Sequence, residues 1–184
     1  HLVNAMMREH GNYDYKRDGF TIHSCQLRPE SRGTVMITSD DPFEHPSIAP
    51  NYLATEGDRI TMRESVKMMR DIAGQSALSP LRGAEALPGA DVQTDEQIDT
   101  FIRTFGETIY HPVGTVAMGI RDDDPVDGEL RVRGVDGLRV VDASVMPTLI
   151  GGNTNAPTIM VAEKAADMIR GIAPMAPEEV EIAA

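Results

Sequence analysis

Tryptophan is absent from this 184-residue sequence, cysteine occurs once, and cationic residues are few. The single cysteine, Cys25, excludes a disulfide within the chain; it fits a reducing compartment such as the cytoplasm, and its expected role is packing. Twenty-nine acidic residues against 17 basic ones give a net charge of −12. This charge repels nucleic acids and anionic membranes, and no basic patch offsets it, so neither is expected as a partner. No apolar run approaches the roughly 20 residues of a transmembrane segment.

The length and composition are those of one domain or most of one. Of the 184 residues, 41% are hydrophobic, which is enough to bury a core. The chain begins with His1 and not with an initiator methionine, and its first residues do not have the layout of a signal peptide. We therefore expect it to be a piece of a longer protein.

The first 110 residues predict strands followed by helices. Two β-branched segments, 18–27 and 32–39, are separated by "RPES" and predict a hairpin or meander in an antiparallel sheet. The segment 40–51 carries three prolines and predicts a loop. Apolar residues then follow the helical period from Thr55 to Gly74, and a second helix is predicted over 94–106, where Thr94 and Gln97 form a capping box.

The last third predicts a strand, a glycine-rich crossover and a helix. The strand, "GLRVVDAS", ends in Asp142 and Ala143, and the helix begins near Asn155 as its cap and ends at Gly171. Its expected core face contains Ile159, Ala162, Ala166 and Ile169. Free N–H groups at such a helix start favour a phosphate or an electron-rich ring edge, although an ordinary structural helix fits the same pattern.

One histidine stands where the backbone is tightly constrained, in "TIYHPVGTVAMG" at 108–119. Residues 108–110 predict the end of a strand. Pro112 favours an extended conformation for His111, and Gly114 allows a sharp bend just afterwards. The residues alone leave two interpretations open: a functional histidine, or one that ends a strand with its ring nitrogens bonded to backbone.

Three blocks, "HPVGTVAMG", "GLRVVDASVMP" and "GGNTNAPTIMVAEKAADMI", resemble in order and spacing the carboxy-terminal part of the glucose-methanol-choline (GMC) flavoprotein oxidoreductases. The resemblance covers roughly residues 18–172. It implies FAD as cofactor and oxidation of an alcohol to the aldehyde. The family's G-x-G-x-x-G dinucleotide fingerprint is missing from the sequence, so we expect an amino-terminal FAD-binding portion of the same enzyme as a separate partner chain.

The fold class expected from this resemblance is α+β, as a fragment of a larger GMC fold. Region 1–110 would be part of a substrate-binding domain, with an antiparallel sheet and flanking helices. Region 111–172 would hold the active-site strand and return into the FAD-binding domain, supplying the carboxy-terminal strand and helix of its Rossmann-like fold. Region 173–184 is expected to be a disordered acidic tail.

The resemblance also implies the site residues. His111 matches the family histidine at the reactive face of the flavin and would act as general base, while Asn155 matches the second polar residue, with Asn153 near enough to compete for that place. A base makes hydride removal from an alcohol easier, and an asparagine can donate a hydrogen bond to the substrate oxygen. The residues implied in cofactor binding are Asp142, Ala143, Asn153, Ala156, Pro157 and Thr158, and no metal is expected.

Two other functions remain open at this point. The family fold also hosts cyanohydrin cleavage, and the chain could be a non-catalytic structural or partner-binding remnant, although His111 and Asn155 are intact. The particular alcohol and the electron acceptor stay open as well. The aromatic residues form no clear cage for a quaternary ammonium group, so the resemblance does not by itself imply choline.

Overall fold

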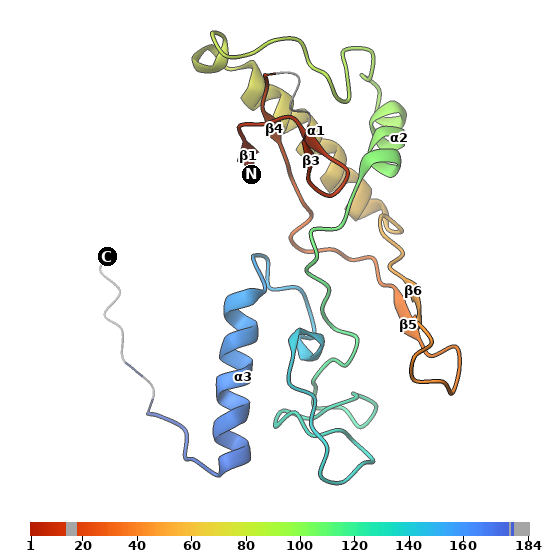
Figure 1. Cartoon of the computed structure of the whole chain (residues 1–184), viewed down its shortest axis with the longest axis vertical. Coiled ribbons are helices and arrows are strands. Elements are labelled where there is room, and N and C mark those ends of the chain that lie inside the picture. The colour runs from red at the N-terminus through yellow and green to blue at the C-terminus, as the bar shows by residue number, and fades with distance from the viewer. Residues whose placement is uncertain (14–17, 177, 179–184) are drawn as a thin grey trace. The chain divides into compact units, whose positions relative to one another are not determined.

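The computed structural model describes residues 1–13, 18–176 and 178 (Figure 1). It divides into two compact units, His1–Tyr110 and His111–Ala184. Within the described residues, no helix is both long enough and apolar enough to cross a membrane. The tail expected to be disordered, 173–184, lies mostly outside the described residues.

Three separate two-stranded antiparallel sheets occur in the described part of the first unit, in place of the single sheet that we expected. They pair β1 (Leu2–Val3) with β4 (Thr21–Ile22), β2 (Met7–Arg8) with β3 (Asn12–Tyr13), and β5 (Thr34–Met36) with β6 (Ser47–Ala49). The predicted pairing of segments 18–27 and 32–39 with each other is therefore wrong.

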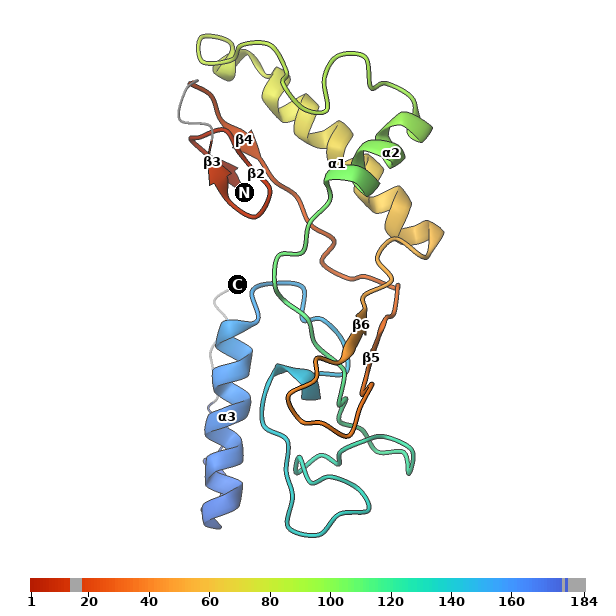
Figure 2. The ribbon, with the colours of Figure 1, turned by 45° about the vertical axis from the view of Figure 1, so that its right-hand side comes forward.

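The proline-rich segment 40–51 is not only a loop, because it contributes β6, which Figure 2 shows beside β5. Pro46 and Pro50 flank this three-residue strand instead of interrupting it. Their missing N–H groups therefore remove no hydrogen bond from the ladder within the strand.

Two helices of the first unit confirm the sequence prediction. Helix α1 (Glu56–Gly74) begins at Thr55, whose side chain accepts a hydrogen bond from the Asp58 amide. Helix α2 (Asp95–Phe105) has both halves of the capping box between Thr94 and Gln97. A short 3₁₀ helix, η1 (Ser76–Leu78), follows α1. Figures 1 and 2 show α1 and α2 side by side, and their contact is apolar. Its buried residues are Val66, Ile98 and Ile102.

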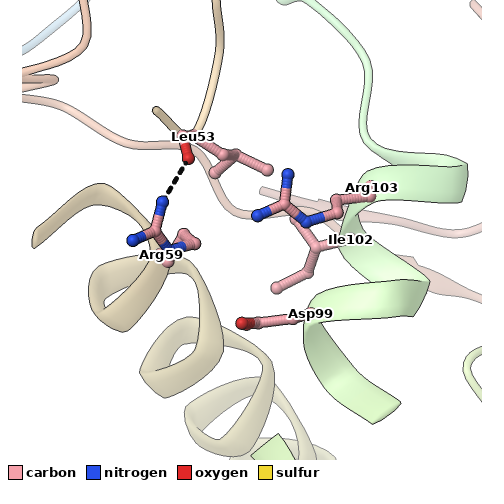
Figure 3. A pocket seen from close by; sticks show the side chains of 5 residues that line it. All are labelled: Leu53, Arg59, Asp99, Ile102 and Arg103. Atoms are coloured by element: carbon pink, nitrogen blue, oxygen red, sulfur yellow. Dashed lines mark hydrogen bonds between the residues drawn. The ribbon is translucent and has the colours of Figure 1, made fainter. Parts of the chain in front are cut away.

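Charged side chains cover the apolar contact between α1 and α2. Arg63 pairs with Glu56 at 2.6 Å and with Asp95 and Asp99 at 3.4 Å each. Figure 3 shows the neighbouring space, where Arg59 donates a hydrogen bond to the Leu53 carbonyl oxygen at 2.9 Å. This space has no room for a water molecule. The helix contact is therefore a packed interface and not a ligand site.

Asp58 joins the start of α1 to the segment that precedes β5. Its side chain is buried, with a relative exposure of 2%. The amides of Glu30 and Ser31 donate to its carboxylate at 2.9 and 2.8 Å, and the Gln26 side chain donates at 3.1 Å. Burial alone would raise the pKa of the Asp58 carboxyl, but hydrogen bonds from Ser31, Glu30 and Gln26 outweigh it and lower the pKa to about 2.

The second unit contains helix α3 (Asn155–Arg170), the 3₁₀ helix η2 (Ala143–Val145) and isolated bridges. The predicted strand at 137–144 is reduced to a single bridge between Arg131 and Arg139. The Rossmann-like arrangement expected for this strand stays a prediction. Residues 108–110 are likewise not a strand, and Tyr110 has a φ of +61°.

The buried face of α3 differs from the predicted one. Val161 and Ala165 enter the core of the second unit, together with Val126, Leu130 and Val145. Ile159 and Ile169 on the predicted face are 53% and 60% exposed. The helix has apolar residues on two sides, and the helical period does not decide which side meets the rest of the unit.

Candidate active site

The backbone around His111 is held by the segment that contains η2. The amides of Val116 and Met118 donate to the carbonyl oxygens of Ser144 and Val145 at 3.1 and 2.8 Å. His111 lies five residues before the first of these bonds and is half-buried.

Gly114 makes the bend between His111 and this pairing. Its φ is +88°, as the sequence predicted for a sharp turn, and an added Cβ would lie 3.3 Å from the Met146 carbonyl oxygen. A residue with a side chain would be strained at this backbone angle, and its Cβ would be crowded by the Met146 carbonyl oxygen. The glycine therefore fixes how the chain leaves His111.

The candidate asparagines lie at the start of α3, in the same unit as His111. Asn153 is exposed just before α3, and Asn155 is the first residue of the helix. The predicted cap is wrong by one position, because Thr154 is the N-cap residue and its side chain makes no capping bond. Within the described part of the chain, neither asparagine side chain is hydrogen-bonded. Both amides are thus available to a ligand.

One core brings the segments of His111 and Asn155 into the same unit. Val116 and Met118 from the histidine segment pack against the cluster that contains Val145 of η2 and Val161 of α3. Segments separated by about forty residues in the sequence are therefore fixed to one another through buried side chains.

The predicted cofactor-binding residues all belong to the second unit. Asp142 is exposed, and its side chain accepts a hydrogen bond from the Ser144 amide at 2.7 Å, which caps η2. Thr158 donates to the Thr154 carbonyl oxygen at 2.7 Å. The side chains of Asp142 and Thr158 thus already form hydrogen bonds with the backbone of this chain. The other predicted residues are Ala143, Asn153, Ala156 and Pro157, of which Ala143 begins η2 and Pro157 lies in the first turn of α3.

Sequence reasoning missed a polar cluster at the end of the first unit. His10, Glu107 and Tyr110 are brought together there, although His10 is 100 residues from Tyr110. No local pattern links these positions. The only sequence signal is that Tyr110 directly precedes His111. Within the described residues, no group of three or more His, Cys, Asp or Glu side chains could hold a metal ion.

Comparison with known proteins identifies the family. The model of the GMC oxidoreductase carboxy-terminal domain matches residues 29–162, and the chain belongs to this family. The oxygen-dependent choline dehydrogenase of Pseudomonas putida is 49% identical over 175 residues, which is 95% of this chain and 31% of that protein. The chain thus spans about a third of the length of such relatives.

Solved structures agree with this assignment. Pyridoxine 4-oxidase from Mesorbium loti matches with a TM-score of 0.76 and 35% identity, covering 80% of this chain and 29% of that one. An FAD-dependent oxidoreductase from Chaetomium thermophilum matches with a TM-score of 0.74 and 34% identity, covering 79% of this chain and 25% of that one. The family's relatives and structural neighbours are FAD-dependent flavoproteins.

The start of α3 fits part of a flavin. The amides of Asn155 and Ala156 lie in the first turn, where a helix offers no acceptor for them, and the cap residue supplies none. No acidic residue lies in this turn. Such a helix end stabilises nearby negative charge by about 1 kcal/mol, so these residues suit an electron-rich ring edge.

Proposed function

We propose that the protein containing this chain oxidises an alcohol to the aldehyde with FAD. The observation that carries the proposal is the shared core that fixes the histidine segment 111–118 against η2 and α3, in a chain of the GMC family. The named relatives and neighbours are dehydrogenases and oxidases. Alcohol oxidation is therefore favoured over cyanohydrin cleavage and over a non-catalytic role.

His111 is the proposed general base. Bound FAD supplies the hydride acceptor. His111 takes the hydroxyl proton of the substrate onto its imidazole, which makes loss of hydride from the adjacent carbon easier. A histidine that is only half-buried can pass this proton on to solvent after each turnover.

Asn155 is the proposed hydrogen-bond donor to the substrate oxygen. Its amide group is unbonded within the described residues, and it heads a helix whose dipole favours negative charge. Asn153 is the competing candidate because it is two residues away and exposed. Asp142 and Ala143 are proposed to border the cofactor through the backbone of η2, since the Asp142 carboxylate already caps that helix.

The remainder of the FAD site is proposed to come from outside this chain. The relatives are about three times as long, and the sequence here lacks the glycine-rich fingerprint that holds a dinucleotide diphosphate. We propose an amino-terminal FAD-binding portion of the same enzyme, present as a partner chain. Region 1–110 is proposed to belong to the substrate-binding domain. A cytoplasmic location, suggested by the single cysteine, also stays a prediction.

Choline is the first alcohol to test, because relatives that are 47% to 49% identical to this chain are named oxygen-dependent choline dehydrogenases. The assay is bleaching of the flavin absorbance by the alcohol under anaerobic conditions. We expect His111→Ala to lower the rate by about 10² to 10⁴-fold, the usual contribution of a positioned acid or base. His45→Ala is the matched control, since His45 is exposed and lies in the first unit. Bleaching at the parent rate in His111→Ala would refute the role of this histidine.

A further inference from the structure

The 3₁₀ helix η2 of the second unit is a short turn that its own backbone holds weakly. It is closed by hydrogen bonds from the Val145 amide to the Asp142 carbonyl oxygen at 3.3 Å and from the Met146 amide to the Ala143 carbonyl oxygen at 3.2 Å. Both bonds are long for backbone hydrogen bonds, and 3₁₀ helices have poorer hydrogen-bond geometry than α-helices. A turn of this kind needs a further contact to keep one shape.

The side chain of Asp142 supplies that contact. It accepts a hydrogen bond from the Ser144 amide at 2.7 Å, which is shorter than either backbone bond of the turn. A carboxylate is also a stronger acceptor than a neutral carbonyl group. The backbone of Asp142 is extended, with a φ of −155° and a ψ of −172°, as is usual for a residue that caps a helix start. The cap is therefore the strongest of the described bonds that shape η2.

The end of η2 holds the segment that follows His111. The carbonyl oxygens of Ser144 and Val145 accept hydrogen bonds from the amides of Val116 and Met118, at 3.1 and 2.8 Å. A helix leaves its last carbonyl oxygens without a donor of its own, so both are available to this neighbouring segment. The shape of η2 thus determines where these two acceptors lie, and with them the histidine segment.

The same turn contacts α3 through its side chain. Val145 is fully buried, and its core cluster includes Val161 of α3. The turn is therefore bonded to the segment of His111 on one side and packed against the helix of Asn155 on the other. All of these contacts lie within the second unit.

We propose that Asp142 is a positioning residue that acts through η2 on the placement of His111 relative to Asn155. The inference rests on the proposed role of His111 as base. Without the cap, the Ser144 amide loses its acceptor and the turn can unwind, which displaces the carbonyl oxygens that hold the histidine segment. A small displacement of a base from its reacting atoms reduces the rate steeply. The carboxylate is thus needed for its acceptor oxygen and not for its charge.

The test separates the acceptor oxygen from the charge in the full-length, FAD-loaded enzyme. Asp142→Glu keeps the charge but is a poor cap, whereas Asp142→Asn loses the charge and caps as well as aspartate does. We expect Asp142→Glu and Asp142→Ala to lower the rate constant of flavin reduction, per bound flavin and at saturating alcohol, about tenfold. Asp142→Asn should recover the rate to within about threefold of the parent. KM should change less than about twofold in all three variants.

Asp136→Ala is the matched control, because Asp136 is exposed in the same unit and its carboxylate accepts no hydrogen bond within the described residues. It should leave the rate at the parent value. Counting the rate per bound flavin separates positioning from stability, since a fold that is only less stable loses flavin without slowing the flavin that remains. The pH profile of Asp142→Glu should have a lower plateau and keep its rising limb, because His111 still titrates.

A double-mutant cycle tests the route through His111. In the His111→Ala background, Asp142→Glu should cause no further loss of rate, because no base is left to position. A loss of about tenfold in that background as well would mean that Asp142 acts independently of the histidine.

A faster reaction in Asp142→Glu than in Asp142→Asn would overturn the proposal, since the charge and not the cap would then matter. A parent rate in Asp142→Glu, or an additive loss in the double variant, would overturn it too. If Asp142→Ala does not hold FAD, the order of the Glu and Asn variants still decides. Failure of the underlying function is distinguishable, because it is indicated by a parent rate in His111→Ala, whatever the Asp142 variants do.

Discussion

Replacing Asp58 by asparagine should destabilise the first unit in a pH-dependent way. The carboxylate is buried and accepts hydrogen bonds from two backbone amides and one side chain. An asparagine keeps one oxygen, but its NH₂ group would face an amide donor that then has no partner. The segment 26–31 would keep the hydrogen bonds that the Ser31 side chain accepts from the Ala54 and Thr55 amides, but its attachment to Asp58 would be weakened.

The pKa of Asp58 gives the magnitude of this effect. The pKa falls from a reference of 3.8 to about 2 in the folded protein, and a difference of this size corresponds to about 2.5 kcal/mol. Because the folded-state pKa is the lower one, this stabilisation is complete above pH 4 and is lost as the pH falls from about 4 through 2. Asp58→Asn should therefore lower the free energy of unfolding by about 2 to 3 kcal/mol at pH 7, and the difference from the parent should shrink in that acid range.

Urea denaturation of the full-length protein, followed by circular dichroism at several pH values, measures this difference. Asp71→Asn is the matched control, because Asp71 is exposed on the same helix and its carboxylate accepts, within the described residues, only a 3.4 Å bond from the Gln75 side chain. Its effect should stay within about 0.5 kcal/mol. The reasoning is refuted if Asp58→Asn unfolds at the parent urea concentration at pH 7, or if its deficit is the same at pH 7 and below pH 3.

Three further predictions concern the proposed site. Asn155→Ala should slow flavin reduction less than His111→Ala does; a larger loss in Asn153→Ala than in Asn155→Ala would reassign the donor. In the parent enzyme, kcat/KM should rise with pH and then level off, because the base must be neutral to accept a proton, and a deuterated carbinol carbon should slow the same rate. A flat profile, or an unchanged rising limb in His111→Ala, contradicts this. Residues 1–184 alone should bind FAD weakly, because the diphosphate-binding turn is missing; stoichiometric tight binding in a titration would contradict that expectation.

Local chemistry in the sequence determined the helices and their ends. Thr55 and Thr94 are caps because a side-chain oxygen can reach an amide three residues further on, which requires no other part of the molecule. Gly171 ends α3 in the left-handed conformation for the same local reason, with a φ of +68°. The block from His111 to Gly119 was sufficient, with two others, to predict the family that the comparisons confirm.

The tertiary structure decided what depends on distant residues. Strand β4 pairs with β1 and not with β5, the next strand along the chain. Helix α3 buries Val161, whereas Ile159 is exposed. Short strands and a helix with two apolar sides fit several partners equally well, so their periodicity leaves the partner open. No local pattern indicated the contact between His10 and Tyr110, because the two residues lie 100 positions apart in the sequence.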